Sequence, residues 1–257
     1  MPKNKLARFR DNASFDDLHQ PPFAQVWNAD YYLKGQWAQA QFRNSNPITL
    51  ELGCGRGEYT LAMATAAPEQ NFVGMDIKGA RIWVGAKAAH EQGIKNVAWV
   101  RARIETLTSF FAPCEISNLW ITFPDPQLKE RREKKRLTCE AFLRSYARIL
   151  APESTIHLKT DSYELFAYTR NLVQELGARI HYALDDIDSH LEHFPLLQIQ
   201  THYEQLFRNQ GKKICYIAFN LPTDWFTEYK GLLLTPQEYW KGAANTETTI
   251  PNILAEL

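Results

Sequence analysis

The strongest candidate for chemistry in this chain is an acid held between two prolines, Asp125 in Phe123-Pro-Asp-Pro-Gln. Pro124 and Pro126 lack the backbone N–H that a central strand needs, so the apolar strand expected over 116–123 must end there. Open α/β sheets bind their ligands at the carboxyl ends of strands, which makes this acid a candidate site residue. The alternative is a turn in which the aspartate only caps its own backbone.

A run of positive charge follows this acid. Six of the eight residues from Lys129 to Arg136 are Lys or Arg, and the other two are Glu. The whole chain balances 29 basic against 29 acidic residues, so the excess is local and favours a polyanionic partner such as RNA. The alternative is a solvated helix start in which Glu130 and Glu133 pair with neighbouring cations.

A second constellation is the glycine loop Glu51-Leu-Gly-Cys-Gly-Arg-Gly, which lies between a β-rich run and a helical stretch. Its G-x-G-x-G spacing differs from the dinucleotide pattern G-x-G-x-x-G and lacks the G-K-[ST] of a phosphate loop. Glu51 would repel a phosphate but can pair with the cationic amino group of a methionyl moiety. Asp76, at the end of the next predicted strand, can hydrogen-bond a ribose diol. These features favour S-adenosylmethionine over a nicotinamide cofactor or a structural turn.

Further polar residues lie later in the chain. Asp161 follows the fifth predicted strand, where it can contact a ligand or cap the next helix. A long polar loop carries Thr201-His-Tyr-Glu204, and loops of that length in a compact domain are usually functional or disordered. His190 and His193 suggest zinc, but no second ligand pair stands at a metal-site spacing, so we expect no metal.

The elements that must position these residues alternate along the chain. Strands are predicted over 48–52, 72–77, 97–102, 116–123, 155–159, 179–184 and 213–220. Helices are predicted over 31–42, 59–66, 79–92, 138–150 and 162–176. Alternation of this kind implies a parallel α/β sheet with right-handed crossovers.

Length and composition indicate one large domain with additions. We divide the 257 residues into a basic and aromatic N-terminal extension (1–45), a catalytic domain (46–220) and a C-terminal extension (221–257). The four cysteines are widely separated and form no C-x-x-C, which is typical of reduced thiols. No secretory h-region and no membrane-spanning window is present, so we expect a cytoplasmic protein with no membrane partner.

Together these motifs resemble the bacterial tRNA (guanine-N7-)-methyltransferases of the TrmB type, over about residues 48–220. The segments that carry the resemblance are 51–57, 72–77, 123–129, 136–138, 157–161 and 201–204. The resemblance implies an α/β, class I Rossmann-like, S-adenosylmethionine-dependent methyltransferase fold, with a central, mostly parallel seven-stranded sheet and helices on both faces. It also implies methyl transfer to N7 of a guanine in the tRNA variable loop, forming 7-methylguanosine, by a monomer or homodimer.

The resemblance further implies roles for individual residues. Asp125 is the expected catalytic acid. The expected cofactor-binding residues are Glu51, Gly53, Gly55, Gly57, Asp76, Arg103 and Asp125. The expected substrate-binding residues are Lys129, Arg131, Arg132, Asp161, Thr201, His202, Tyr203 and Glu204.

Three departures from the family pattern limit this transfer. Gln127 stands where the family commonly has Trp, which takes away a stacking surface. Arg103 stands where relatives often carry Asp or Asn, so its contact with the adenine is in doubt or passes to the backbone. The tail from Pro222 matches nothing in the family. The alternatives are a methyltransferase that acts on another RNA or a small molecule, and a non-catalytic tRNA-binding protein.

Overall fold

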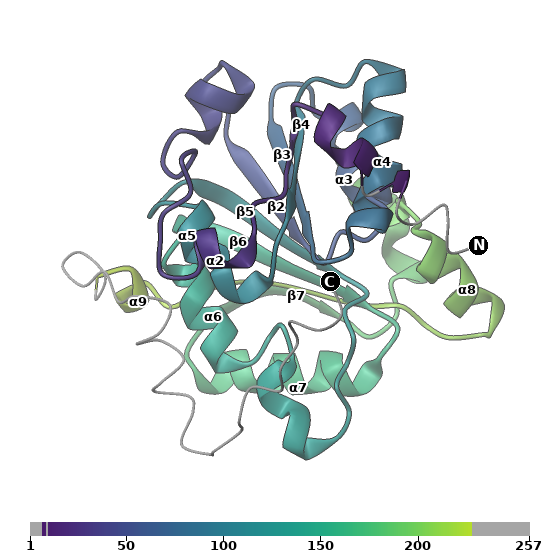
Figure 1. Cartoon of the computed structure of the whole chain (residues 1–257). Coiled ribbons are helices and arrows are strands. Elements are labelled where there is room, and N and C mark those ends of the chain that lie inside the picture. Colours follow the sequence, from purple (N-terminus) through teal and green to yellow (C-terminus); the bar gives the residue numbers. More distant parts are fainter. Residues whose placement is uncertain (1–6, 9, 228–257) are drawn as a thin grey trace.

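The computed structural model describes residues 7–8 and 10–227, which form one sheet with helices on both of its faces (Figure 1). The strand order is β1-β4-β3-β2-β5-β6-β8-β7. Neighbouring strands are parallel except where β8 pairs with β6 and β7. The strands are β1 (Leu18–His19), β2 (Ile48–Leu52), β3 (Asn71–Asp76), β4 (Val97–Arg101), β5 (Ile116–Thr122), β6 (Leu150–Thr160), β7 (Arg179–Leu184) and β8 (Cys215–Asn220).

Helices connect most of these strands, and shorter helical turns fill the loops. The α-helices are α2 (Phe23–Val26), α3 (Glu58–Ala66), α4 (Gly79–Gln92), α5 (Leu107–Phe110), α6 (Glu140–Ala147), α7 (Tyr163–Glu175), α8 (His202–Asn209) and α9 (Asp224–Thr227). The 3-10 turns are η1 (Asn12–Ser14), η3 (Ile104–Thr106), η4 (Glu130–Lys135), η5 (Asp188–His193) and η6 (Pro195–Gln198), and η2 (Trp37–Phe42) is a π-helical segment. Within the described ranges, no helix combines the length and apolar character that a membrane crossing requires.

The seven predicted strands are all present, but the sheet has eight. The additional strand is β1, in which Leu18 and His19 pair in parallel with Trp99 and Val100 of β4. The predicted helix over 31–42 is wrong in its first half, because the chain turns through a left-handed Gly35 (φ +77°) and only η2 is helical.

The helix predicted over 138–150 is shorter in the structure. It ends at Ala147, and Leu150 already belongs to β6, where it pairs with Ile116 of β5. Strand β6 therefore starts earlier than the predicted 155–159, with an irregular step at Glu153 (φ +65°).

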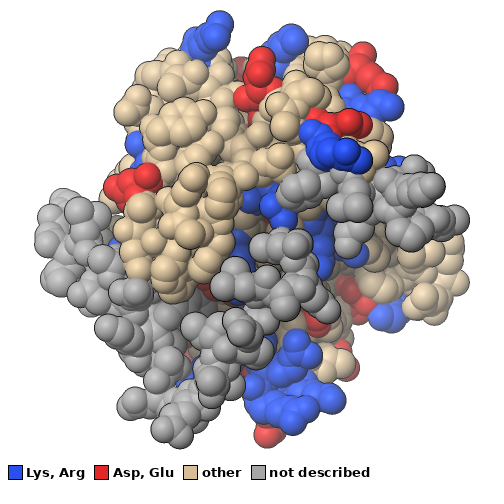
Figure 2. Space-filling model, viewed as in Figure 1, with Lys and Arg blue, Asp and Glu red and all other residues tan. Residues whose placement is uncertain are grey.

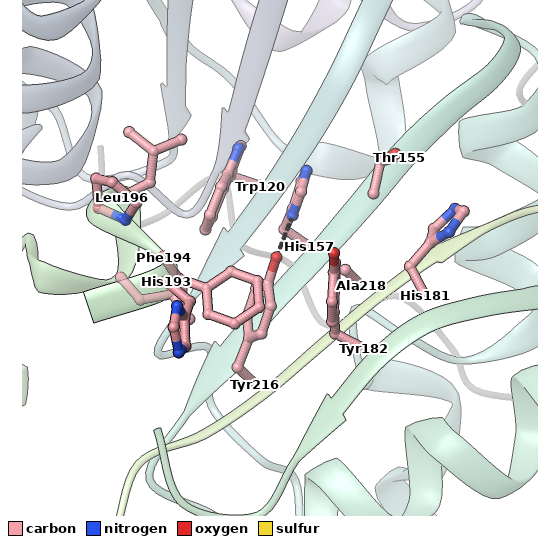
Figure 3. Close-up of a pocket in the computed structure, with 12 residues that line it drawn as sticks. Trp120, Thr155, His157, His181, Tyr182, His193, Phe194, Leu196, Tyr216 and Ala218 are labelled. Atoms are coloured by element: carbon pink, nitrogen blue, oxygen red, sulfur yellow. Dashed lines mark hydrogen bonds between the residues drawn. The ribbon is translucent and has the colours of Figure 1, made fainter. Parts of the chain in front are cut away.

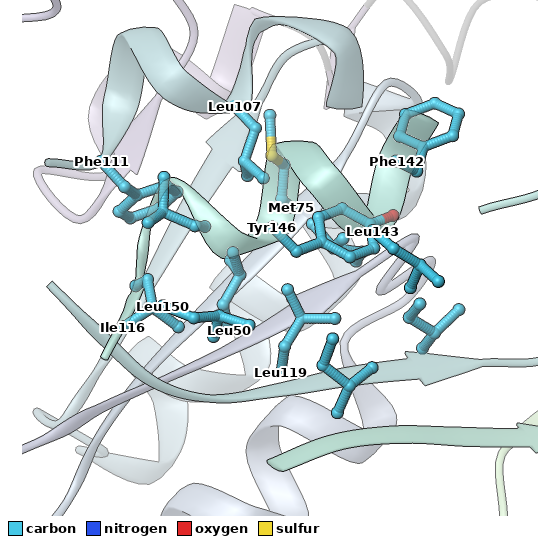
Figure 4. Packing of buried hydrophobic residues seen from close by; sticks show 14 of the residues in the cluster. Leu50, Met75, Leu107, Phe111, Ile116, Leu119, Phe142, Leu143, Tyr146 and Leu150 are labelled. Atoms are coloured by element: carbon cyan, nitrogen blue, oxygen red, sulfur yellow. The ribbon is translucent and has the colours of Figure 1, made fainter. Parts of the chain in front are cut away.

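One face of the sheet packs against α5, α6 and α7. Leu50 of β2 and Leu119 of β5 meet Leu143 and Tyr146 of α6 in a continuous apolar cluster (Figure 4). All four side chains are buried, and each such residue contributes roughly 1.5–3 kcal/mol through burial. This layer fixes the central strands and therefore the positions of the loops at their carboxyl ends.

The segment before β2 packs into the same layer. Trp37 is fully buried, and its indole N–H donates to the carbonyl oxygen of Phe110 at 2.8 Å. The Ser109 hydroxyl donates to the carbonyl oxygen of Val26 at 2.7 Å. Trp37 and Val26 are thus part of the core, whereas Phe23 and Tyr32 of the same segment are exposed.

The other face packs around Trp99, which lies fully buried under α3 and α4. A Cβ atom added to Gly57, Gly74 or Gly85 would lie within 2.2–2.7 Å of the Trp99 ring. The third glycine of the sequence motif is therefore required for helix packing.

Candidate active site at the carboxyl ends of the strands

The glycine loop follows β2 and is fastened to the end of β3 by its own backbone. Gly53 and Cys54 both donate their N–H to the carbonyl oxygen of Met75, at 2.7 and 3.1 Å. Gly53 and Gly55 have left-handed backbones (φ +73° and +57°), and a Cβ on either would meet no atom closer than 3.9 Å. Since no side chain fills the space beside these two glycines, the loop can hold a ligand against its backbone.

Asp76 ends β3, and its carboxylate joins two loops. One oxygen accepts the N–H of Gly55 at 3.0 Å, and the other accepts the N–H of Lys78 at 2.7 Å. The side chain is almost buried, and a carboxylate oxygen can accept more than one donor. Asp76 therefore lies beside the glycine loop, in hydrogen-bond contact with Gly55.

Glu51 lies on β2 with only 1% of its surface exposed. Its two carboxylate oxygens accept hydroxyl hydrogens from Thr60 of α3 and, at 2.6 Å, from Thr122 of β5. Burial raises the pKa of Glu51 to about 7, although the hydroxyl donors act in the opposite direction. Glu51 thus holds β2, α3 and β5 together, a role that the sequence did not indicate.

Arg103 follows β4 and is exposed. Its guanidinium lies 5.5 Å from the ring centre of Phe23, and its carbonyl oxygen accepts the Thr106 hydroxyl at 2.8 Å. The side chain is thus directed at the N-terminal segment. A cofactor contact by Arg103 stays a prediction.

Asp125 is exposed in the loop between β5 and η4. One carboxylate oxygen accepts the N–H of Gln127 at 3.1 Å, as in the capping turn that the sequence allowed. Within the described residues the second oxygen makes no hydrogen bond, so it can accept donors from a ligand. Capping and ligand binding are therefore compatible at this acid.

The Asp125 loop is held at both ends. Phe123 and Gln127 have left-handed backbones (φ +47° and +48°), a conformation that costs non-glycine residues free energy and persists only where neighbours enforce it. The N–H of Phe123 donates to the carbonyl oxygen of Lys159 at 2.8 Å, and Arg136 donates to the carbonyl oxygen of Gln127 at 3.3 Å. Asp125 therefore has a defined position despite its exposure.

The basic cluster, residues 129–136, forms the exposed turn η4 and its flanks. Lys129, Arg131 and Arg132 are exposed and make no ion pair with any described residue. Glu133 instead accepts a hydrogen bond from Tyr168 of α7. Figure 2 shows Lys and Arg side chains gathered at the lower edge of the drawn face and in the hollow above it. The cluster thus presents positive charge to the solvent.

A buried ion pair anchors the segment that carries residues 201–204. Lys159, at the end of β6, and Glu204 of α8 are both fully buried, with Nζ and Oε2 2.7 Å apart. The Lys159 ammonium also donates to the carbonyl oxygens of Leu197 and Ile199, at 2.9 and 2.8 Å. Burial lowers the pKa of Lys159, and the Glu204 carboxylate opposes that shift. The Thr201 hydroxyl accepts the N–H of Glu204 at 3.1 Å and so caps α8.

His202 and Tyr203 lie on the first turn of α8. The His202 N–H donates to a carboxylate oxygen of Glu58 at 3.1 Å, which ties α8 to α3 beside the glycine loop. Tyr203 is exposed, and the guanidinium of Arg81 lies 5.5 Å from its ring centre. Of the four predicted residues 201–204, Tyr203 is therefore the one whose side chain is most available to a partner.

Asp161 forms an ion pair with Lys212, with Oδ2 and Nζ 2.5 Å apart. The alternative role as a helix cap belongs instead to Ser162, whose hydroxyl accepts the N–H of Leu165. The predictions also missed Thr60, Thr122 and Lys159 as partners of the two buried glutamates. The available signal for Lys159 was a lysine next to Leu158 at the end of a predicted central strand.

Known proteins share this sequence and architecture. The family model described as "Putative methyltransferase" matches residues 45–217. The tRNA (guanine-N(7)-)-methyltransferase of Christiangramia forsetii is 46% identical, covering 85% of this chain and 98% of that relative. The protein of the same name from Bacteroides fragilis is 43% identical, covering 87% and 88%. The solved 16S rRNA methyltransferase KamB has the same fold, with a TM-score of 0.56 at 14% identity over 75% of this chain and 95% of that one. This chain therefore belongs to the tRNA (guanine-N(7)-)-methyltransferase family.

Proposed function

We propose that this enzyme transfers a methyl group from S-adenosylmethionine to N7 of a guanine in the variable loop of tRNA. The observation that carries the proposal is the strand order β3-β2-β5, which brings Asp76, the glycine loop and Asp125 to one edge of the sheet. The names of the relatives supply the substrate class.

The residues around the glycine loop fit the cofactor. The open space beside Gly53 and Gly55 lets a ligand contact the backbone of the loop directly. The carboxylate of Asp76 retains lone pairs that can accept from ribose hydroxyls. S-adenosylmethionine, when bound, supplies a methyl group on a positively charged sulfur. The ionised form of Glu51, whose pKa is about 7, would place negative charge behind the loop and favour a cationic ligand.

The methyl transfer itself does not require a general base. N7 of guanine already presents a lone pair, so no base has to remove a proton before the N7–carbon bond forms and the carbon–sulfur bond breaks. Positive charge then passes to the purine ring. The open oxygen of Asp125 can accept from guanine N1–H or the 2-amino group, which adenine lacks, and can offset that charge.

RNA binding falls to the exposed cations. Lys129, Arg131 and Arg132 are unpaired within the described residues and stand next to the Asp125 loop, where they can neutralise backbone phosphates. Tyr203, next to Arg81, offers a ring on which a base can stack.

The free thiols of the described cysteines suit a reducing compartment, and we place the enzyme in the cytoplasm.

The decisive experiment incubates the protein with methyl-labelled S-adenosylmethionine and unmodified tRNA, then digests the tRNA to nucleosides. We expect labelled 7-methylguanosine at one position in the variable loop. Label in any other nucleoside, or label only in small molecules of a cell extract, would refute the proposal.

A further inference from the structure

A cavity of about 350 Å³ lies on the face of the sheet opposite α6 and α7. Figure 3 shows the residues that line it. Its volume falls in the range of about 300–1,000 Å³ that is typical of small-molecule sites. Its floor comes from β5, β6, β8 and β7, and its outer wall from the end of η5 and from η6. None of the predicted site residues lines this cavity. Leu197 lines it and also accepts a hydrogen bond from Lys159.

Strand register creates the cavity. Trp120, His157, Ala218 and Tyr182 stand in one row across the four strands, because each is the register partner of the next. Three of these side chains are aromatic rings and the third in the row is only a methyl group. The gap above Ala218 therefore lies between ring walls, with Phe194 meeting Tyr182 edge to face at 4.8 Å.

The lining is mostly aromatic and aliphatic, with His181 and His193 at its rim. His157 stacks on Trp120 with ring centres 4.1 Å apart and planes 7° apart, and its Nδ1 is hydrogen-bonded to the Tyr216 hydroxyl at 2.8 Å. Burial lowers the pKa of His157 to about 3, so this imidazole is neutral at physiological pH. The lining contains no Lys, Arg, Asp or Glu. Such walls favour a neutral planar ring over an ion, since aromatic faces stack on a base and a charge would lose its solvation.

Lys159 separates the cavity from the strand ends. It follows His157 by two positions on β6 and so lies on the same face of the sheet. Its ammonium is bound to the carbonyl oxygens of Leu197 and Ile199, where the chain leaves the cavity wall and leads to α8. The cavity is thus a separate site, coupled to residues 201–204 by a short piece of chain.

We propose that this cavity binds a neutral heteroaromatic base, with Trp120, His157, Tyr182 and Phe194 as its stacking walls. The base belongs either to an unpaired nucleotide of the RNA or to a free nucleoside. The RNA version rests on the proposed function, whereas the binding of a nucleoside does not.

The test measures binding of guanosine, uridine and cytidine to the full chain by saturation-transfer NMR. S-adenosylhomocysteine is present in excess, so that nucleosides are kept out of the glycine loop. We expect binding by the unaltered protein and at least tenfold weaker binding by Tyr182→Leu and by Ala218→Leu, which fills the floor. The matched control is Tyr32→Leu, which removes an exposed tyrosine outside the cavity and should change affinity less than twofold.

Tyr182 is half-exposed, so its replacement keeps the test valid if Ala218→Leu fails to fold. Absence of nucleoside binding, or equal binding by Tyr182→Leu and the unaltered protein, overturns the proposal. The KM for tRNA then separates the two sources. A KM raised about tenfold in Tyr182→Leu assigns the base to the RNA, and an unchanged KM with lost nucleoside binding assigns it to a free nucleoside. Failure of the unaltered protein to form 7-methylguanosine would count against the proposed function and leave the nucleoside measurement readable.

Discussion

Two buried glutamates lie near the carboxyl ends of the strands, and the protein treats them differently. Glu51 at the end of β2 is surrounded by hydroxyl donors, and its pKa is raised to about 7. Glu204 at the start of α8 is paired with the buried ammonium of Lys159 and with Arg208. One carboxylate is thus held without a cation, and the other is part of an ion network.

The difference matches the two roles that we propose for this edge of the sheet, which are cofactor binding and RNA binding. The glycine loop, which we propose holds the cofactor, is fixed mainly by backbone hydrogen bonds, which need no charge. The segment around α8, which we propose approaches the RNA, is fixed by side-chain ion pairs, including Arg208 with Asp188 and Lys212 with Asp161. We infer that the conformation of the glycine loop does not depend on ion pairs. The position of α8 and its flanking segment does depend on them.

The largest expected effect comes from breaking the ion pair. Lys159→Met leaves Glu204 buried without its main cation, which should lower the free energy of unfolding by about 3–5 kcal/mol. The control is the double variant Lys159→Met with Glu204→Met, which removes both charges and should recover most of the loss. Urea denaturation at pH 7.5 measures both. A single variant within about 1 kcal/mol of the unaltered protein would contradict the comparison.

The second prediction concerns Glu51 and pH. Its folded pKa of about 7 exceeds the ordinary 4.5, so the folded state binds more protons between these values and stability falls as pH rises through them. The full effect is about 3 kcal/mol, complete above pH 7 and absent below pH 4.5. Glu51→Gln should remove this part of the pH dependence. Parallel stability curves for the variant and the unaltered protein from pH 4.5 to 8 would disprove it.

The third prediction concerns catalysis at Asp125. Asp125→Ala should lower kcat/KM for tRNA by about 100-fold, equivalent to about 2.7 kcal/mol, because the guanine loses its acceptor while the scaffold is untouched. The unfolding midpoint should stay unchanged, and cofactor affinity measured on the same variant tests the expected cofactor contact of Asp125. Glu175→Ala, at an exposed acid on the end of α7, is the control. Near-normal turnover by Asp125→Ala would remove this acid from the mechanism.

The smallest effect is expected at the basic cluster. Reversing the charge of Arg131 and Arg132 to Glu should weaken tRNA binding by about tenfold at physiological salt and flatten its dependence on salt concentration. Affinity for S-adenosylmethionine should not change. Equal losses in both affinities would mean that the cluster supports the fold instead of the RNA.

The sequence predicted the central strands well, because buried parallel strands are short apolar runs bounded by glycines and prolines. It could not predict β1, since two residues carry no periodicity. Nor could it predict the Lys159–Glu204 pair or the cavity above Ala218. Both depend on which strands become neighbours in the sheet. The position of β8 between β6 and β7 cannot be read from the local residue pattern of any one strand.

The short strand β1 also covers the border of the sheet beside β4. Without Leu18 and His19, β4 would be the border of the sheet and would offer the apolar run Val97–Val100 with unpaired backbone groups to any other extended chain. The backbone N–H of Trp99 is occupied by the carbonyl oxygen of Asp17 at 2.7 Å. The N-terminal segment thus occupies backbone groups of β4 that could otherwise pair with another chain. Shortening it past Leu18 would expose that border of the sheet.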